Sequence, residues 1–330
     1  MFQLIQDFPE ELSHALNIIQ SQDVGQLPTD IRNIVISGMG GSGIGGSLVQ
    51  AMFSGRFKVP VLVNKGYNLP LCAGDKTLFI ACSYSGNTEE TLQVFEEAGK
   101  RSCYRVAICS GGELSNKAKQ EGVLCIVMPW GRPPRASLGY SITLLTGYLS
   151  KSGLLSGFDF EKEWSAVIEH IRHHKEEIKK QTFALASVIK DKLPVLYSDE
   201  LLEAVSVRWK QQLNENAKML CWHNIYPEMN HNELVGWREK NQNLALLFLM
   251  HGHEHPRVKL RMKMNEPVYH GITSEIHKIE ASGHSETERI FYLIHFGDWL
   301  SYYLAEVRGY DPMEIDVLMK LKHDLSEIPT

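Results

Sequence analysis

The sequence predicts an α/β protein with two lobes, each built on a mostly parallel β-sheet flanked by helices. Short runs rich in Val and Ile alternate with helix-like stretches, which is typical of right-handed βαβ units. The alternation occurs twice, on either side of a charged stretch at 153–190. The 330 residues, 43% of them hydrophobic and 22% charged, are enough for two domains with their own cores.

The first domain, which we place at 1–152, should contain a five-stranded sheet. It begins with an amphipathic helix at about 8–21. Apolar runs of strand length follow at 33–37, 59–63, 77–81, 105–109 and 124–127. Helical patterns accompany them at 42–54, 88–99, 112–120 and 136–151.

The stretch at 153–190 carries charges of both signs at helical spacing, so we expect a solvated helix that connects the two domains. The second domain, at 191–330, repeats the strand and helix alternation. Its strands are expected at 194–198, 243–250 and 274–280. Its helices are expected at 199–218, 255–264, 285–308 and 314–325.

Charge and hydropathy exclude several classes of partner. The net charge of −5 gives no basic surface for nucleic acid or for an anionic membrane. The longest apolar run, Leu244 to Met250, is far shorter than a membrane span. The first residues are partly acidic and lack the apolar stretch of a signal peptide. We therefore expect a cytoplasmic protein.

A glycine loop follows the first strand, with six glycines among residues 38–46. It fits the dinucleotide pattern G-x-G-x-x-G, but the second strand ends in Asn64 and Lys65, without the acidic residue that binds a ribose. A triphosphate loop would need a lysine before Ser47, which is absent. The remaining ligand is a phosphate monoester, held at a helix N-terminus by Gly41 and Ser42.

A second loop, "SYSGNTEET", supplies further hydroxyl groups in Ser83, Ser85 and Thr88. It follows the third strand, and parallel sheets bind ligands at the carboxyl ends of their strands. An ordinary loop in which Thr88 caps a helix is the alternative. Two hydroxyl-bearing strand ends in one sheet favour the phosphate site.

These two loops resemble those of the sugar isomerase (SIS) domain. With "PPRASLGY", "NENAK", "PEMNHNE" and "RGYDP…LMKLKHDL", nearly the whole chain resembles the bifunctional phosphoglucose/phosphomannose isomerases. The resemblance implies interconversion of glucose 6-phosphate or mannose 6-phosphate with fructose 6-phosphate, through a cis-enediolate. It also implies a homodimer and a reaction that needs neither a metal nor another cofactor.

The resemblance also implies roles for four residues. Glu215 would be the base that moves a proton between C1 and C2, and Arg135 would stabilise the enediolate, with Arg132 as the alternative. His231 would open the sugar ring, and in related isomerases the neighbouring subunit often supplies this histidine. Lys322 would enter the site, with Lys320 as the alternative.

Three questions stay open from the sequence. The family often has a threonine–proline pair shortly after the "DP" turn, whereas this chain reads "DPMEIDV" there, which leaves the preference for glucose or mannose undecided. A non-catalytic sugar-phosphate sensor, or an isomerase of another phosphorylated sugar, would keep the same phosphate loops. The histidine-rich stretch "HGHEHP" at 251–256 is interpreted as a polar loop rather than a metal site.

Overall fold

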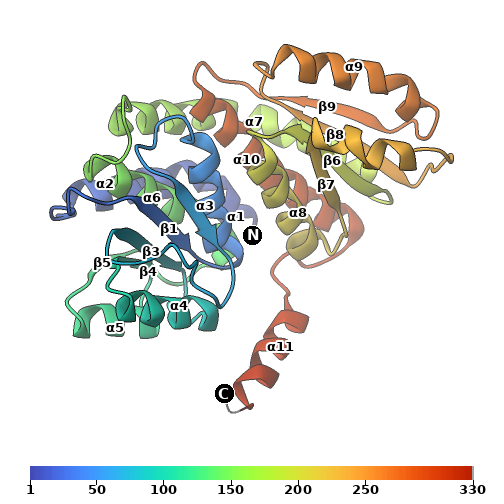
Figure 1. Cartoon of the computed structure of the whole chain (residues 1–330). Coiled ribbons are helices and arrows are strands. Elements are labelled where there is room, and N and C mark those ends of the chain that lie inside the picture. Colours follow the sequence, from blue (N-terminus) through green and yellow to red (C-terminus); the bar gives the residue numbers. More distant parts are fainter. Residues whose placement is uncertain (329–330) are drawn as a thin grey trace.

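The computed structural model describes residues 1–328 and contains two parallel sheets in two lobes, as the sequence predicts (Figure 1). The first sheet has the strand order β2-β1-β3-β4-β5, and all its neighbours pair in parallel. Its strands are β1 (Asn33–Ser37), β2 (Val61–Asn64), β3 (Thr77–Ser83), β4 (Tyr104–Cys109) and β5 (Leu124–Val127). All five predicted strands of this lobe are confirmed.

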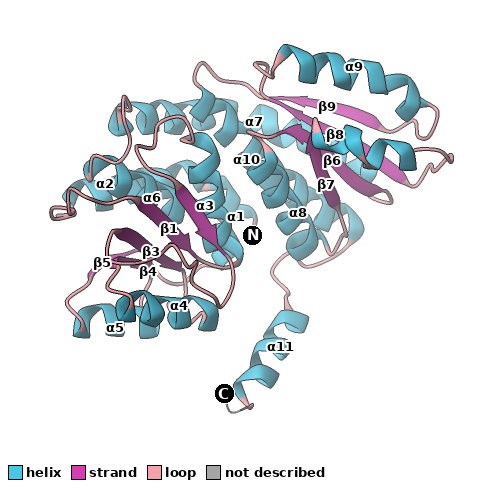
Figure 2. Ribbon diagram, viewed as in Figure 1, coloured by secondary structure: helices cyan, strands magenta, loops and turns pink. Residues whose placement is uncertain are grey.

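Helices cover both faces of the first sheet because its strands are apolar on both sides. Along β3, Leu78 and Ile80 face a core shared with α2, α3 and α6, while Phe79 and Ala81 face α4 and α5 (Figure 2). These helices are α2 (Phe8–Ser21), α3 (Gly40–Met52), α4 (Glu89–Lys100), α5 (Gly112–Gln120) and α6 (Leu138–Lys151). A short helix, α1 (Phe2–Gln6), precedes them, and a 3-10 turn, η1 (Pro134–Ala136), leads into α6.

The second sheet has four parallel strands in the order β7-β6-β8-β9. They are β6 (Leu193–Asp199), β7 (Trp222–Tyr226), β8 (Leu244–Met250) and β9 (Ile276–Glu280). The edge strand β7 is missing from the sequence prediction. Its sequence, WHNIY, has two polar residues in five and lacks the apolar run that identifies its neighbours.

The helices of the second lobe cover opposite faces of this sheet. On one face α9 packs over Tyr197 and Phe248, and on the other α8 and α10 pack over Leu196 and Leu247. The long helix α10 begins at its capping residue Ser285 and ends at a left-handed Gly309. The bounds are α8 (Glu203–Ala217), α9 (Pro256–His270) and α10 (Glu286–Arg308), with 3-10 turns η2 (Glu228–His231) and η3 (Glu233–Gly236) after β7.

The helix α7 (Phe160–Ile189) joins the lobes but is not the solvated connection that its charges suggested. One side of it is buried, with Trp164 and Ile171 fully enclosed, and it packs along α10 and against α2. Trp164 also donates a hydrogen bond of 2.7 Å to Thr143 of α6. The charged residues occupy only the outer side, so the prediction of a solvated helix is wrong.

The last helix, α11 (Asp316–Ser326), extends away from both lobes (Figure 1). Every side chain of α11 that the structure describes is exposed. Within residues 1–328, no helix is both long and apolar enough to cross a membrane.

A buried histidine should make the stability of this fold depend on pH. His295 of α10 is fully buried, stacks on Phe8 and accepts a hydrogen bond of 3.0 Å from Trp299 Nε1. Burial lowers the pKa of His295 to about 3, so it stays neutral in the folded protein. The unfolded chain binds this proton near pH ~6.5, and stability is therefore lost as the pH falls. Between pH 7.5 and 5.5, His295 should lower the free energy of unfolding by about 1.4 kcal/mol.

Urea unfolding of the wild type and of His295→Gln at both pH values measures this term. Gln keeps an acceptor for Trp299 but cannot titrate, and all other groups are common to both proteins. The variant should therefore lose less stability than the wild type on acidification. Equal losses in the two proteins would exclude His295 as the source.

Candidate active site

The glycine loop connects β1 to the N-terminus of α3 and lies against the turn that carries Arg135. A Cβ atom at Gly41 would lie 2.8 Å from the carbonyl oxygen of Pro134, so only glycine fits there without a shift. The loop stands between β1 and β3, where the chain order of the sheet changes direction. Such switch points are the usual ligand sites of open α/β sheets.

The hydroxyl loop after β3 is hydrogen-bonded to the glycine loop. Ser42 Oγ accepts a bond of 3.0 Å from the backbone N–H of Tyr84. Ser83 Oγ lies 2.9 Å from Thr88 Oγ1, and Ser85 Oγ accepts from the N–H of Asn87 at 3.2 Å. The structure therefore brings both predicted loops to one sheet edge. A hydroxyl that accepts one bond still has its own proton to donate to an anion.

Two further features shape this edge. Gly86 has a left-handed φ of +69°, and a Cβ there would lie 1.8 Å from the carbonyl oxygen of Gly111, so the loop requires glycine. Lys65, which follows β2, lies on the other side of the glycine loop, with its Cε 3.7 Å from where a Cβ of Gly43 would be. Sequence reasoning missed Lys65 as a cation near these loops, although its place after an edge strand was a usable signal.

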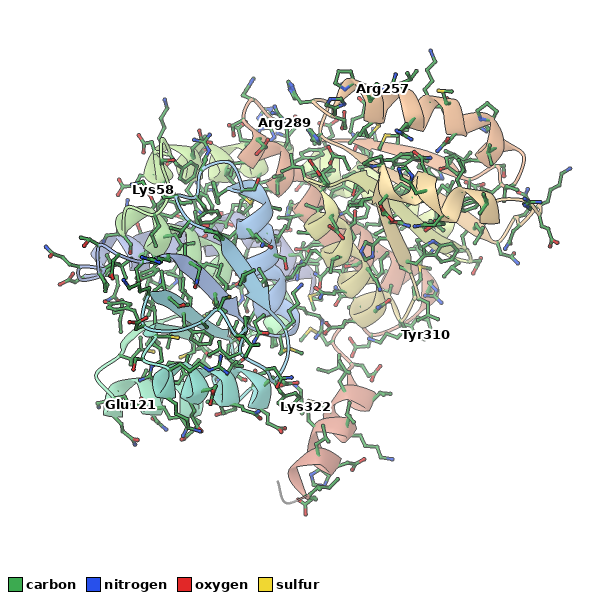
Figure 3. All side chains as sticks on the ribbon, in the orientation of Figure 1. Lys58, Glu121, Arg257, Arg289, Tyr310 and Lys322 are labelled. Atoms are coloured by element: carbon green, nitrogen blue, oxygen red, sulfur yellow. The ribbon has the colours of Figure 1, made fainter. Side chains whose placement is uncertain are left out.

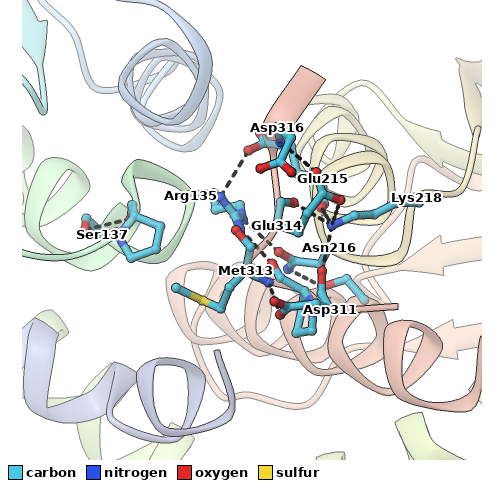
Figure 4. A network of polar contacts seen from close by, with 12 residues as sticks. Arg135, Ser137, Glu215, Asn216, Lys218, Asp311, Met313, Glu314 and Asp316 are labelled. Atoms are coloured by element: carbon cyan, nitrogen blue, oxygen red, sulfur yellow. Dashed lines mark hydrogen bonds and ion pairs between the residues drawn. The ribbon is translucent and has the colours of Figure 1, made fainter. Parts of the chain in front are cut away.

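Arg135 of the first lobe faces Glu215 of the second (Figure 4). Its Nη1 lies 3.5 Å from Glu215 Oε2, and its Nε donates to Asn216 Oδ1 at 2.8 Å. Arg135 is only 3% exposed, and burial lowers the pKa of its guanidinium from the usual value, while Glu215 opposes that shift. The alternative, Arg132, instead bonds Glu11 at 3.0 Å. The structure thus brings Arg135, and not Arg132, to Glu215.

The segment between α10 and α11 closes around this pair. Arg135 Nη2 donates to the carbonyl oxygens of Pro312 at 2.7 Å and of Met313 at 3.3 Å. Lys218 Nζ donates to three carbonyl oxygens, those of Glu215, Asp311 and Glu314, at 2.7 to 2.8 Å (Figure 4). Met313 and Glu314, which follow the "DP" turn, therefore lie directly beside the pair.

A buried ion pair holds the backbone of Arg135. Arg208 Nη2 donates to the Arg135 carbonyl oxygen at 2.7 Å and to both Asp298 oxygens at 3.0 and 3.1 Å. Gln212, one turn along α8, donates to Asp298 at 2.7 Å. Burial raises the pKa of Asp298, and the contacts with Arg208 and Gln212 oppose that shift. Sequence reasoning found none of these three residues, because their partners are about 70 to 90 positions away.

His231 and Glu215 of one chain are not brought together. Glu215 lies on the last turn of α8, which leads to the start of β7, and His231 lies in η2, beyond the end of β7. The four steps from Trp222 to Tyr226 alone span roughly 13 Å. His231 is exposed at the far end of the strand.

Lys320 and Lys322 also lie away from Glu215 on the exposed helix α11, with Lys322 labelled in Figure 3. The structure of a single chain therefore assembles Arg135 and Glu215 beside the two loops, but it includes neither the histidine nor either lysine.

The histidine-rich loop after β8 makes structural hydrogen bonds. His251, which is buried, lies 2.7 Å from Asp199 Oδ2, and His255 accepts a bond from the N–H of Arg257 at the start of α9. Within residues 1–328, no group of at least three His, Cys, Asp or Glu side chains could hold a metal ion.

Comparison with known proteins identifies the family. Residues 178–325 match the model of the bacterial phospho-glucose isomerase C-terminal SIS domain. The chain is 36% identical to the bifunctional phosphoglucose/phosphomannose isomerase of Caldicellulosiruptor bescii, over 99% of both chains. The enzyme of the same name from Aquifex aeolicus is also 36% identical, over 94% of this chain and 96% of its own.

This chain belongs to the bifunctional phosphoglucose/phosphomannose isomerase family. Like the other members, it is an isomerase, an intramolecular oxidoreductase. Of the more divergent relatives, D-glucosamine-6-phosphate 4-epimerase of Sulfolobus acidocaldarius is 30% identical over 68% of this chain and 69% of its own.

Solved structures show the same fold. The C-terminal domain of glucosamine-fructose-6-phosphate aminotransferase from Francisella tularensis superposes with a TM-score of 0.71 at 17% identity, over 94% of this chain and 97% of its own. Tagatose-6-phosphate ketose/aldose isomerase from Escherichia coli gives 0.68 at 13% identity, over 94% of this chain and 93% of its own. The two-lobed SIS architecture predicted from the sequence is confirmed.

In this isomerase, loss of Arg208 should strongly destabilise the site. Arg208→Met leaves the Asp298 carboxylate buried without a cation, which should lower the free energy of unfolding by about 3–5 kcal/mol. Changing both residues, Arg208→Met with Asp298→Leu, removes the uncompensated charge and should recover more than half of that loss. Urea unfolding of the two single variants and the double variant measures the coupling. Additive losses would show that the two charges do not depend on each other.

Proposed function

We propose that this chain interconverts glucose 6-phosphate, mannose 6-phosphate, or both, with fructose 6-phosphate. The observation that carries the proposal is the ion pair of Glu215 and Arg135, 3.5 Å apart, beside two loops suited to a phosphate. A carboxylate can act as the base that moves a proton between C1 and C2, and a fixed guanidinium beside it can stabilise the negative charge that develops on the oxygen. The names of the relatives that are 36% identical support these substrates.

The phosphate would be held at the edge of the first sheet. Ser42 and Ser85 would donate their hydroxyl protons to its oxygens, and Ser83 and Thr88, whose hydroxyls bond each other, would supply one further proton between them. The N–H of Gly41, in the first turn of α3, would add a backbone donor. The loops hold each other through the bond from Tyr84 to Ser42, so the donors are fixed before the ligand arrives. Binding would then cost little loop entropy.

The proton would move on Glu215. Starting from the open-chain aldose, the carboxylate takes the proton from C2, and the electron pair forms the C1=C2 bond of an enediolate while negative charge develops on the oxygen of C1. A proton then passes from the hydroxyl oxygen of C2 to the oxygen of C1, and return of the first proton from Glu215 to C1 leaves the carbonyl group on C2, which gives the ketose. Arg135, whose charge is permanent, would stabilise the enediolate. The reaction is redox-neutral within the sugar and needs neither a metal nor another cofactor.

Ring opening would require a second copy of the chain. A histidine can both donate and accept a proton near neutral pH, as ring opening needs. His231 of the same chain is separated from Glu215 by the length of β7. A homodimer in which each copy lends its His231 to the other would remove this difficulty. Lys322, or Lys320 in its place, would assist from α11.

We expect the segment after the "DP" turn, which lacks the threonine that the family often has there, to influence the preference between the two aldoses. The carbonyl oxygen of Met313 accepts a hydrogen bond from Arg135, so the backbone of this segment lies beside the proposed reacting pair. Since hexose phosphates are charged and are made and used inside cells, we also expect the protein in the cytoplasm.

Replacing the proposed base should abolish turnover but not binding. Glu215→Gln keeps the size and polarity of the side chain, and removing a general base typically costs about 10²–10⁴-fold in kcat. A coupled assay with glucose 6-phosphate and mannose 6-phosphate, with a chelator present, measures kcat. Calorimetric titration with fructose 6-phosphate measures binding, which should stay within a few fold of the wild type.

The same measurements separate the alternatives. A sugar-phosphate sensor would bind the ligand, but even the wild type would show no turnover. An isomerase of another sugar would act on glucosamine 6-phosphate or a related ester in preference to glucose and mannose 6-phosphates. Full turnover by Glu215→Gln would disprove the role given to this carboxylate.

Mixed dimers test the shared histidine. Co-expression of Glu215→Gln with His231→Gln gives hybrid dimers in which one site has Glu215 from one chain and His231 from the other. If half of the dimers are hybrids with one intact site of two, about a quarter of wild-type activity should return.

Arg135→Met co-expressed with Glu215→Gln is the matched control. Arg135 and Glu215 pair within one chain, so no hybrid site contains both and activity should stay at the level of the single variants. No recovery in the histidine mixture would place His231 outside the partner's site.

A further inference from the structure

The turn that carries His231 is anchored to the second sheet on both sides of the histidine. Met229, two residues before it, is fully buried in the core that β6 and β8 share with α9. Glu233, two residues after it, is hydrogen-bonded to Tyr197 of β6 and to Asn224 of β7. His231 itself is exposed between these two anchors. The backbone that presents the histidine to solvent is therefore held from both directions.

Tyr197 is the main anchor after the histidine. Its hydroxyl donates to Glu233 Oε1 and accepts a hydrogen bond of 2.9 Å from Trp237 Nε1, so it binds both ends of η3. The ring is fully buried on the inner strand β6, where its centroid lies 5.8 Å from that of Tyr226 and 5.5 Å from that of Phe248. Burial and the Glu233 carboxylate raise the pKa of Tyr197, so the phenol keeps the proton that it donates. A ring enclosed in this way gives the turn a fixed point of attachment.

The carboxylate of Glu233 matches the two donors that face it. One oxygen accepts from Tyr197, and the other accepts from Asn224 Nδ2 at 2.7 Å. The Asn224 amide is held in this orientation because its Oδ1 accepts from the N–H of Ile225 at 2.8 Å. A carboxylate only accepts hydrogen bonds when ionised, so it satisfies both donors, whereas a glutamine would offer a single acceptor oxygen. Asn224 is one of the polar residues that distinguish β7 from the apolar strands, and its contact with Glu233 accounts for it.

We propose that Tyr197 and Glu233 are positioning residues for His231, which fix the turn from which the imidazole reaches the sugar ring. The inference rests on the proposed function, which gives ring opening to His231. Both residues act through the histidine and not on the substrate. Their contacts lie within one chain, so they hold His231 in the same way in whichever copy's site it acts. Misplacing a reacting group by about 1 Å can cost about 10²-fold in rate, so an exposed histidine that transfers a proton needs such anchors.

Removing the Tyr197 hydroxyl tests the role of the anchor. Tyr197→Phe keeps the buried ring and removes only the oxygen that holds the turn. Tyr226→Phe is the matched control, because it removes one buried phenol oxygen from the same cluster, but that oxygen bonds Tyr269 and Asn265 at 2.6 and 3.1 Å. Urea unfolding measures the stability of each variant, and the coupled assay gives kcat and KM for glucose 6-phosphate and mannose 6-phosphate.

Tyr197→Phe should lower kcat about tenfold or more, with KM within a few fold of the wild type. Tyr226→Phe should keep kcat within about twofold, although it loses a comparable buried hydrogen bond. If the two variants lower kcat equally, Tyr197 has only a structural role and the inference is overturned.

The His231→Gln background separates positioning from a general loss of structure. A residue that acts only through His231 has nothing left to position there, so Tyr197→Phe should change the residual turnover of His231→Gln by less than about twofold. The same factor in both backgrounds would overturn the inference. Glu233→Gln leaves Tyr197 intact and should show the same dependence on His231, so the result does not require Tyr197→Phe to fold.

The outcomes also distinguish this inference from the proposed function. A large loss of turnover in His231→Gln, with none in Tyr197→Phe or Glu233→Gln, would overturn the positioning role and leave the proposed function in place. Full turnover by His231→Gln would instead refute ring opening by this histidine. A wild type without turnover on either aldose would refute the proposed reaction itself.

Discussion

The bond from Arg208 to the Arg135 carbonyl oxygen is the contact on which the geometry of the site depends. Arg135 belongs to a short turn of the first lobe, and its side chain reaches α8 of the second. Arg208 fixes the backbone of that turn from α8, and Asp298 of α10 holds Arg208 in place. A charge buried this deeply is costly unless every partner is present. These contacts join the two lobes in the arrangement that sets Arg135 against Glu215.

The fold was largely predictable because its main signals are local in sequence. The β3 run TLFIACS is apolar at nearly every position, as a strand covered on both faces must be. Two elements were misjudged for opposite reasons. The half-buried edge strand β7 has too few apolar residues to be recognised, and α7 has so many charges that its buried side, with Trp164 and Ile171, is obscured. In both cases, contacts with the rest of the fold determine the burial of the segment, and its average hydrophobicity or charge does not.

The site also has parts that the local sequence predicts and parts that depend on contacts between distant residues. The phosphate loops are contiguous in sequence, and their glycine and serine spacing has a direct structural meaning, so the pattern predicts where Ser42 and Ser83 meet. Arg135 and Glu215 could be nominated only through family resemblance, since 80 residues separate them. The residues that hold Arg135 in place, Arg208 and Asp298, could not be predicted at all. Nothing in the sequence around Arg208 or Asp298 distinguishes a buried charge from an exposed one, because burial depends on how α8 and α10 cross.

The pairing of Arg135 with Glu215 has a consequence for the proposed reaction. Before proton transfer, Nη1 of the guanidinium faces the carboxylate, while its Nε and Nη2 donors are occupied by Asn216 and two carbonyl oxygens. When Glu215 takes the proton from carbon, it becomes neutral, while the sugar gains the negative charge as an enediolate. The negative charge thus moves over a short distance next to a cation that is already in place, and no new charge is created in the site. Such a transfer needs little rearrangement of the surrounding dipoles, which is the main electrostatic advantage of a fixed active site. In the proposed reaction, the rigid hold on Arg135, from Arg208 behind it and Asn216 beside it, would serve catalysis as well as the fold.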